Sequence, residues 1–222
     1  MVSVWQRASG KGQGMLLSFL IIASGWWHIR AAYGADYRQF YLSKPLTMLF
    51  IIALAFGYQG YDHDGSHAWI LLGLCLSLAG DVLLMLPADR FIAGLAAFLV
   101  AHLCYIVGFA QGPLLLNLVD GLLLLLVAGM VFGVLWSKLG EMRIPVFCYM
   151  LVIICMAWVA AGAWHASLTA GSAAALVGAL MFLFSDTMLA LDRFRRPFPQ
   201  ARAWIMSSYF AAQFLIAGSL AG

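Results

Sequence analysis

Two carboxylates lie inside otherwise apolar runs of this sequence, where a charge is costly to hold. Asp81 lies in the run SLAGDVLLML, and Asp186 lies in the run SDTML about a hundred residues later. Each is soon followed by the tripeptide Asp-Arg-Phe, at 89–91 and 192–194. An ionisable side chain at membrane depth usually faces a bundle interior or a wet cavity and serves a function. The pair therefore predicts either an acid/base site or a transport path, and we favour the acid/base site.

The composition is that of an integral membrane protein. Of the 222 residues, 64% are hydrophobic and only 9% are charged, and the mean hydropathy is +0.96. The net charge of +3 is small and its basic residues fall between apolar runs, so we expect no nucleic-acid partner. The four cysteines lie within apolar runs, where free cysteine acts as a small hydrophobe, and they predict neither disulfides nor a zinc framework.

The elements that must position the carboxylates are long apolar runs. A helix needs about 17–25 apolar residues to cross a hydrocarbon core of about 30 Å. The sequence predicts an all-α, polytopic membrane helix bundle in one domain, residues 1–222, surrounded by membrane lipids. The predicted spans are 15–33, 44–60, 67–86, 91–110, 114–136, 143–163, 171–191 and 203–221.

Alternate loops differ in charge, which predicts the orientation. Short loops rich in Lys and Arg stay in the cytoplasm. One side carries Arg30, Arg38, Lys44, Arg90, Lys138, Arg143, Arg193, Arg195, Arg196 and Arg202, and the other carries Arg7 and Lys11. We therefore expect the odd-numbered loops in the cytoplasm, both termini outward, and a location in the cell (inner) membrane.

The two halves of the chain resemble one another. Pro45 opens the second predicted span as Pro145 opens the sixth, and the third and seventh spans carry the carboxylates. This order indicates a four-plus-four parallel repeat, an arrangement that places sites between the halves. Chance similarity among apolar helices is the alternative.

Polar side chains from six predicted helices fall at a similar depth, counted at about 1.5 Å per helical residue. We expect Asp81 and Asp186 to be catalytic and the others to line the same cavity and bind substrate. The others are Lys44, His102, Tyr105, Tyr149, Tyr209 and Gln213. His102 and Tyr105 share one helical face, as do Tyr209 and Gln213. A single interhelical hydrogen bond is the alternative role for His102 and the tyrosines.

The remaining histidines are weaker candidates for a functional site. Asp62, His63, Asp64 and His67 could be drawn as metal ligands, but they fall in a short polar loop that we expect to be solvated on the outward side. His28 and His165 follow Trp27 and Trp164, which fits the aromatic belts of membrane interfaces. We expect no metal and no cofactor.

Several motifs together resemble one family. They are Lys-Pro-Leu-Thr-Met at 44–48, Gly-Asp-x-x-Leu at 80–84, the pattern Phe91-x-x-Gly94-x-x-x-Phe98-x-x-x-His102-x-x-Tyr105, and Phe-Ser-Asp at 184–186. Their order and spacing resemble the YhhN-like lysoplasmalogenase family over nearly the whole array of spans. The resemblance implies an eight-helix membrane hydrolase of ether-lipid metabolism. Its substrate would be a lysophospholipid, the lysoplasmalogen, whose vinyl ether bond is cleaved to a fatty aldehyde and a glycerophospho-headgroup.

The residues can supply that chemistry. Vinyl ether cleavage needs an acid to protonate carbon and a base to activate water. Two carboxylates in one poorly solvated cavity cannot both ionise cheaply, so one can serve as acid and the other as base. Glycosidases divide the labour of two carboxylates in the same way. Lys44 could meet a phosphate or neutralise one carboxylate.

Two other functions stay open. A small proton-coupled transporter could use Asp81 and Asp186 as protonatable relays. A metal-dependent lipid hydrolase would need buried ligands, and His102 is the first candidate. The sequence leaves open which carboxylate is the acid, the preferred headgroup and the oligomeric state.

Overall fold

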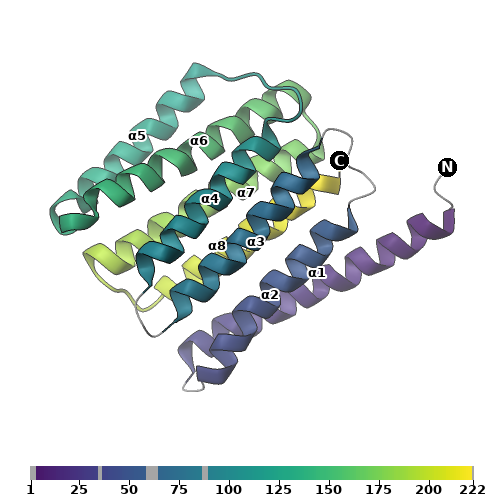
Figure 1. Ribbon diagram of the computed structural model, residues 1–222, viewed down its shortest axis with the longest axis horizontal. Helices are drawn as coiled ribbons and strands as arrows, with labels where there is room; N and C mark the ends of the chain where they lie inside the picture. The colour runs from purple at the N-terminus through teal and green to yellow at the C-terminus, as the bar shows by residue number, and fades with distance from the viewer. Residues whose placement is uncertain (1–3, 35–36, 59–64, 87–89, 222) are drawn as a thin grey trace.

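The computed structural model describes residues 4–34, 37–58, 65–86 and 90–221 (Figure 1). Over these residues the fold is all helical, and eight helices are long and apolar enough to cross a membrane, which confirms the predicted fold class. The helices are α1 Val4–Tyr33, α2 Tyr37–Gly57, α3 Ser66–Met85, α4 Phe91–Phe109, α5 Leu118–Leu135, α6 Arg143–Ser167, α7 Ala170–Ala190 and α8 Ala201–Gly218. The chain is an integral membrane protein.

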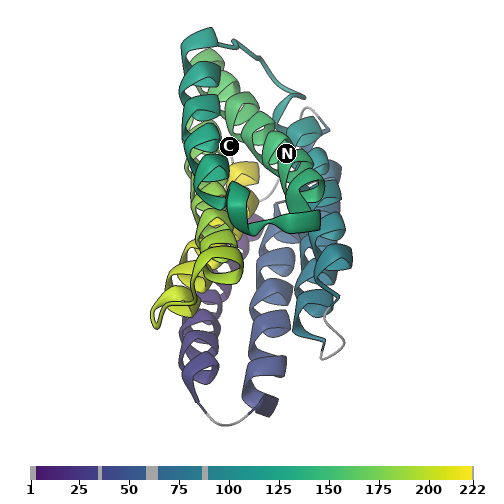
Figure 2. The same cartoon turned by 90° about the vertical axis from the view of Figure 1, so that its left-hand side faces the viewer.

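The helices form one bundle with a pair at each edge. Helices α1 and α2 pack together at one edge and α5 and α6 lie at the other, with α3, α4, α7 and α8 between them (Figures 1 and 2). Helix α3 lies along α4, and α7 lies along α8. Helix α2 reaches α8 as α6 reaches α4. These neighbours are those that a parallel repeat expects, although the repeat itself stays a prediction.

The two prolines that suggested the repeat occupy different positions. Helix α2 begins at Tyr37, so Pro45 lies inside the helix rather than at its start. Pro145 lies in the first turn of α6. A proline in the first turn costs little because its missing N–H would have no helical partner there. The prolines therefore do not mark equivalent helix starts.

Helix ends differ from the predicted spans where capping groups set them. Helix α5 begins at Leu118 rather than near 114, because the Asn117 side chain accepts a hydrogen bond from the Val119 N–H at 2.9 Å. Helix α7 starts from a capping box of Thr169 and Ser172 and continues into a π-helical turn, Leu191–Arg195. Apolar composition sets how much chain crosses the membrane, whereas caps set where each helix ends.

Glycines let α3 and α4 approach closely. A methyl group at Gly80 would lie 2.7 Å from Cε2 of Phe98, and one at Gly73 would overlap the ring of Tyr105. Small residues permit such close packing between membrane helices. This contact fixes the face of α3 that carries Asp81, the residue after Gly80.

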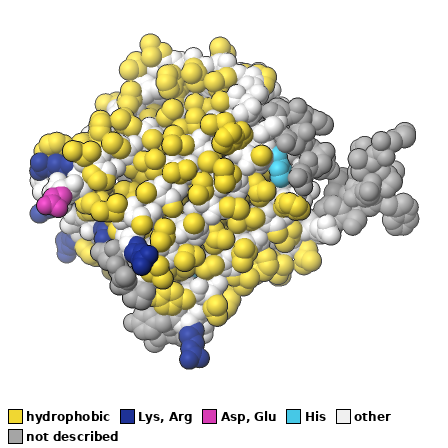
Figure 3. Space-filling view, in the orientation of Figure 1, with side chains coloured by type: hydrophobic (Ala, Val, Ile, Leu, Met, Phe, Trp, Pro, Cys, Tyr) yellow, Lys and Arg dark blue, Asp and Glu magenta, His cyan; other side chains and the backbone are white. Residues whose placement is uncertain are grey.

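The surface is divided by residue type. Hydrophobic side chains cover the visible flank of the bundle, and Lys and Arg side chains gather toward one end (Figure 3). That end holds the α5–α6 and α7–α8 connections, where Lys138, Arg143, Arg193 and Arg196 lie. The candidate site lies in the half of the bundle nearest this end.

Candidate active site

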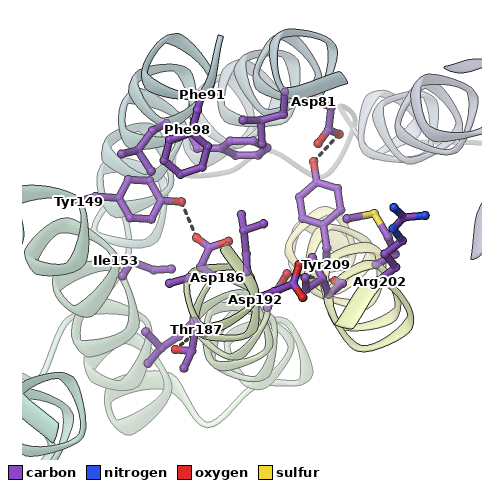
Figure 4. A pocket seen from close by; sticks show the side chains of 18 of the residues that line it. Asp81, Phe91, Phe98, Tyr149, Ile153, Asp186, Thr187, Asp192, Arg202 and Tyr209 are labelled. Carbon is purple, nitrogen blue, oxygen red and sulfur yellow. Dashed lines mark hydrogen bonds between the residues drawn. The ribbon is translucent and has the colours of Figure 1, made fainter. Parts of the chain in front are cut away.

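Asp81 is the most deeply enclosed charge of the candidate site. It lies one turn before the end of α3 and has no exposed surface. Its Oδ1 is 2.8 Å from Nζ of Lys44, and its Oδ2 accepts a hydrogen bond of 2.6 Å from the hydroxyl of Tyr209 (Figure 4). Helices α2, α3 and α8 thus meet at this carboxylate. A buried carboxylate that is paired and hydrogen-bonded in this way is stabilised in its ionised form.

Lys44 is nearly as enclosed as its partner. It is 6% exposed on α2, and its ammonium lies 5.3 Å from the centre of the Tyr209 ring. An ammonium over an aromatic face gains a cation–π attraction that grows as water is excluded. Of the two roles expected for Lys44, the geometry fulfils the neutralisation of a carboxylate.

Asp186 lies on α7 in a different environment. Its Oδ2 accepts a short hydrogen bond from the hydroxyl of Tyr149 on α6, and the side chain is half-buried. Within the described residues Asp186 makes no ion pair. The preceding residue, Ser185, is turned away and donates to the Ile205 carbonyl of α8 at 3.0 Å, which holds α7 against α8. Each carboxylate therefore accepts a hydrogen bond from a tyrosine, but only Asp81 has a lysine as its counter-ion.

One cavity of about 420 Å³ contains both carboxylates in its wall. Lys44, Tyr149 and Tyr209 also line it, and Phe91 and Phe98 of α4 form another side (Figure 4). Asp81 and Asp186 lie on different sides of the cavity, each with its tyrosine (Figure 4). A small reacting group could therefore meet both carboxylates.

The cavity extends from the carboxylates in two directions. Toward α1 and α8 its wall includes the charged side chains Arg202 and Asp192. Toward α5, α6 and α7 its wall is apolar, and we name this part the apolar arm. The apolar arm is lined by Val127, Ala128, Val131, Leu135, Val146, Met150, Ile153 and Leu183. The cavity thus suits an amphiphile with one charged end and one apolar end.

Three of the predicted substrate-binding residues lie behind the cavity wall. Tyr105 donates to Oε1 of Gln213 at 2.7 Å and lies 3.2 Å from the hydroxyl of Ser77. His102 is fully buried, with its ring centre 4.5 Å from that of Phe182 and 5.3 Å from that of Tyr149. His102, Tyr105 and Gln213 are not part of the cavity lining. His102 packs against Tyr149, which lines the cavity, but contact of these three residues with substrate stays a prediction.

The sequence did not predict a group of buried polar side chains between α1 and α2. His28 has no exposed surface and its Nδ1 lies 2.8 Å from the hydroxyl of Ser43, next to Lys44. Thr47 donates to Ser24 at 3.0 Å one turn further along. The interfacial position expected for His28 is wrong, because its ring packs against Phe210 inside the bundle. The sequence pattern that could have predicted this contact is a four-residue spacing, which places Ser24 and His28 on one helical face and Ser43 and Thr47 on another.

Arg202 and Asp192 were also missed as cavity residues. Arg202, in the first turn of α8, donates to the Ala32 carbonyl of α1. Asp192, in the π-helical turn, accepts from the Phe198 N–H at 3.1 Å. Arg202 had been counted only as a loop charge, and Asp192 had been noted only as part of the Asp-Arg-Phe tripeptide at 192–194. A helix that continues past its expected end brings such residues to the cavity mouth.

The outward residues considered as metal ligands are largely outside the described part of the chain. Asp62, His63 and Asp64 lie outside it. His67 is described, and the solvated loop expected for it is wrong. It lies in the first turn of α3, is 3% exposed, and its Nε2 lies 2.9 Å from the Ala55 carbonyl. Among the described residues, no three His, Cys, Asp or Glu side chains gather as a metal site would require.

Comparison with known proteins identifies the family of this chain. The profile of the YhhN family matches residues 39–220, which is well over half of the chain. The membrane protein YhhN of Escherichia coli O157:H7 is 34% identical over 208 residues, covering 93% of this chain and 99% of that protein.

Mammalian proteins match over a smaller share. Lysoplasmalogenase TMEM86A of Bos taurus is 36% identical over 183 residues, covering 78% of this chain and 73% of that protein. Lysoplasmalogenase TMEM86B of Homo sapiens is 38% identical over 155 residues, covering 69% of this chain and 64% of that protein. No solved structure matches the chain.

Proposed function

The chain belongs to the YhhN family, and from that premise we propose that it is a membrane hydrolase that cleaves the vinyl ether bond of lysoplasmalogens. The products would be a fatty aldehyde and a glycerophospho-headgroup. Similarity to proteins named lysoplasmalogenase supports the substrate class. The observation that carries the proposal is that the buried carboxyl group of Asp81 and the half-buried one of Asp186 line one cavity between membrane helices.

The reaction needs one proton donor and one activated water. The acid would protonate the second carbon of the alkenyl chain, which leaves positive charge shared between the first carbon and the ether oxygen. Water would then add to the first carbon while the base accepts its proton. The resulting hemiacetal would break its bond to the glycerol oxygen, which takes a proton, and the aldehyde would be released. Carboxylates are suited to both roles.

We assign the acid to Asp186 and the base to Asp81 from their different partners. Lys44 and Tyr209 stabilise a negative charge on Asp81, so this residue can accept a proton from water and stabilise the cation. Asp186 accepts a hydrogen bond from the Tyr149 hydroxyl and makes no ion pair among the described residues. A carboxyl without a directly paired cation in a poorly solvated cavity keeps its proton more readily than one in an ion pair. Two like charges in one cavity reinforce this division.

The amphiphilic cavity supports a lysophospholipid as the substrate. The phosphate would lie toward Arg202, since Lys44 is already occupied by Asp81. An arginine fork can bind phosphate with two parallel hydrogen bonds. We propose that Lys44, Tyr149 and Tyr209 contact the reacting part of the substrate. His102, Tyr105 and Gln213 would support the wall behind them.

The distribution of basic residues supports an orientation. Lys and Arg gather at the end of the bundle where the cavity lies (Figure 3). Because such short loops are retained in the cytoplasm, we propose that the odd-numbered loops are cytoplasmic and both termini face outward. In the inner membrane of a cell, the substrate would then reach the site from the inner leaflet.

The experiment that tests the function is a product analysis. Purified protein in detergent with EDTA would receive lysoplasmalogen or its ester analogue in D₂O. We expect aldehyde from lysoplasmalogen alone, with one deuterium beside the carbonyl from protonation of carbon. Solute movement across sealed vesicles without any aldehyde would favour the transporter, and loss of activity in EDTA that zinc restores would favour a metal-dependent hydrolase.

A further inference from the structure

The apolar arm of the cavity has no charged side chain among its lining residues, in contrast to the opposite end at Arg202 and Asp192. In Figure 4, Asp186 lies between Arg202 on one side and Ile153 on the other. A molecule bound across the cavity would therefore place an apolar part and a charged part on opposite sides of the carboxylates. A hydrocarbon chain has no polar group that such a wall would leave without a hydrogen bond, so it is the favoured occupant of such a space.

Helix α5 forms the outer wall of the apolar arm. Only 17% of the apolar stretch of α5 is buried inside the bundle, against 50% of that of α8. Its buried residues, Gly121, Ala128 and Leu135, recur every seventh residue along one stripe. The remaining faces carry exposed leucines such as Leu122 and Leu126. Helix α5 therefore separates the cavity from lipid by the thickness of a single helix.

Among the residues that the structure describes, the polar side-chain contacts of α5 lie at its ends. At its start, the Trp158 indole donates to the Asn117 carbonyl at 2.8 Å, and His165 Nε2 lies 2.7 Å from Asp120 Oδ2. At its far end α5 reaches the π-helical turn Leu191–Arg195. Between these ends Ala128 and Val131 face the cavity. The middle of the helix is therefore held against the bundle by van der Waals contacts.

We propose that the apolar arm binds the single hydrocarbon chain of the substrate, which reaches it from the bilayer alongside α5, and that Ala128 sets the chain length accepted. Ala128 is the smallest side chain lining the arm and is 6% exposed. A larger side chain there would fill the arm and leave the carboxylates unchanged. The other end of the cavity carries Arg202 and Asp192, which suits the charged end of the same molecule. This inference rests on the proposed function for the identity of the substrate and its reacting bond.

The first test does not require turnover. A lysophospholipid with a diazirine near the end of its chain is photolysed with the wild-type protein in detergent, and labelled peptides are mapped by mass spectrometry. We expect labels on Ala128, Val131, Met150 or Ile153 that excess unlabelled lysophospholipid removes. Labels confined to Leu122, Leu126 and Met130 on the outer face of α5, or labels that excess lipid does not remove, would overturn the inference.

The second test measures chain-length selectivity. The Ala128→Trp variant should lose roughly tenfold or more of its rate on a long chain of about eighteen carbons and keep its rate on one of about eight carbons. The matched control is Leu126→Trp, two residues away and 60% exposed to lipid, which should keep the wild-type profile. An unchanged profile in Ala128→Trp, or an equal loss on both chains, contradicts the inference. Absence of aldehyde from the wild type contradicts the proposed function instead, and the photolabelling result still decides the chain site.

Discussion

The ammonium of Lys44 lies 2.8 Å from Oδ1 of Asp81 inside the bundle, with 7% and 0% of the two side chains exposed. Placing two charges out of water is costly, and the loss is offset only when the pair has good geometry and further hydrogen bonds. Here Tyr209 supplies the additional hydrogen bond to Asp81. This ion pair joins α2 to α3. It also distinguishes Asp81 from Asp186, whose partner is a tyrosine without a lysine.

Replacing Lys44 by Met should both destabilise and inactivate the protein. The substitution leaves the buried charge of Asp81 uncompensated, which costs about 3–5 kcal/mol when one partner of a buried pair is removed. Adding Asp81→Asn should recover most of the stability and none of the activity. Thermal unfolding in detergent and aldehyde release measure the two effects. Lys138→Met, at the exposed α5–α6 connection, is the control, and equal stability of Lys44→Met and this control would refute the role of the pair.

The hydroxyl groups of Tyr149 and Tyr209 should each contribute to turnover. Each donates to a carboxyl group. A hydrogen bond to the ionised Asp81 contributes about 1.5–3 kcal/mol, and one to the neutral acid Asp186 contributes about 0.5–1.5 kcal/mol. Tyr209→Phe should therefore lose about tenfold to a hundredfold in kcat, Tyr149→Phe should lose about twofold to tenfold, and both should remain folded. Tyr105→Phe is the matched control, because Tyr105 bonds Ser77 and Gln213 behind the cavity wall. A larger loss of kcat in Tyr105→Phe than in the other two would reverse this assignment.

Sequence spacing predicted the depth of the site but not the direction of each side chain. Counting residues from helix ends placed Lys44, Asp81, Tyr149, Asp186 and Tyr209 at one level, and the structure brings these five to one cavity. The same count cannot determine how each helix is rotated about its axis. That rotation depends on contacts between helices that are far apart in sequence.

His102 illustrates what the sequence could not reveal. It shares a helical face with Phe98, yet Phe98 lines the cavity and His102 packs against Phe182 one turn deeper. Within the described part of the chain, neither ring nitrogen of His102 has a hydrogen-bond partner. Only the position of Phe182 on α7, set by the packing of α7 against α8, shows that the cavity ends before His102.

Gly73 should be far less tolerant of substitution than Gly129. A methyl group at Gly73 would overlap the Tyr105 ring, whereas one at Gly129 meets nothing within 4 Å. Overpacking of a filled core usually costs about 1–3 kcal/mol. Gly73→Ala should therefore unfold at a lower temperature in detergent, and Gly129→Ala should be neutral or slightly stabilising. Identical unfolding temperatures for the two variants would contradict the close α3–α4 packing.

The rate should depend on pH through two titrations that belong to the carboxylate pair. Lowering the pH protonates the base and removes activity, and raising the pH ionises the acid and also removes activity. Coupled carboxylates titrate in two macroscopic steps, so a bell-shaped profile of kcat is expected. In Asp186→Asn the limb on the alkaline side should disappear from the residual activity. A wild-type profile that rises or falls through one titration alone would contradict the division into acid and base.

The most direct measurement is aldehyde release by Asp81→Asn and Asp186→Asn, with wild-type protein alongside. Both substitutions preserve shape and remove the ability to exchange a proton, and a general acid or base contributes about 10²–10⁴ in rate. We predict that each variant loses about a hundredfold or more of its turnover and that Asp186→Asn elutes as the wild type does from a sizing column. Because Asp81→Asn leaves the buried ammonium of Lys44 unpaired, it is compared with the double variant Lys44→Met/Asp81→Asn, which removes both charges. Turnover near that of the wild type in either folded variant would contradict the account.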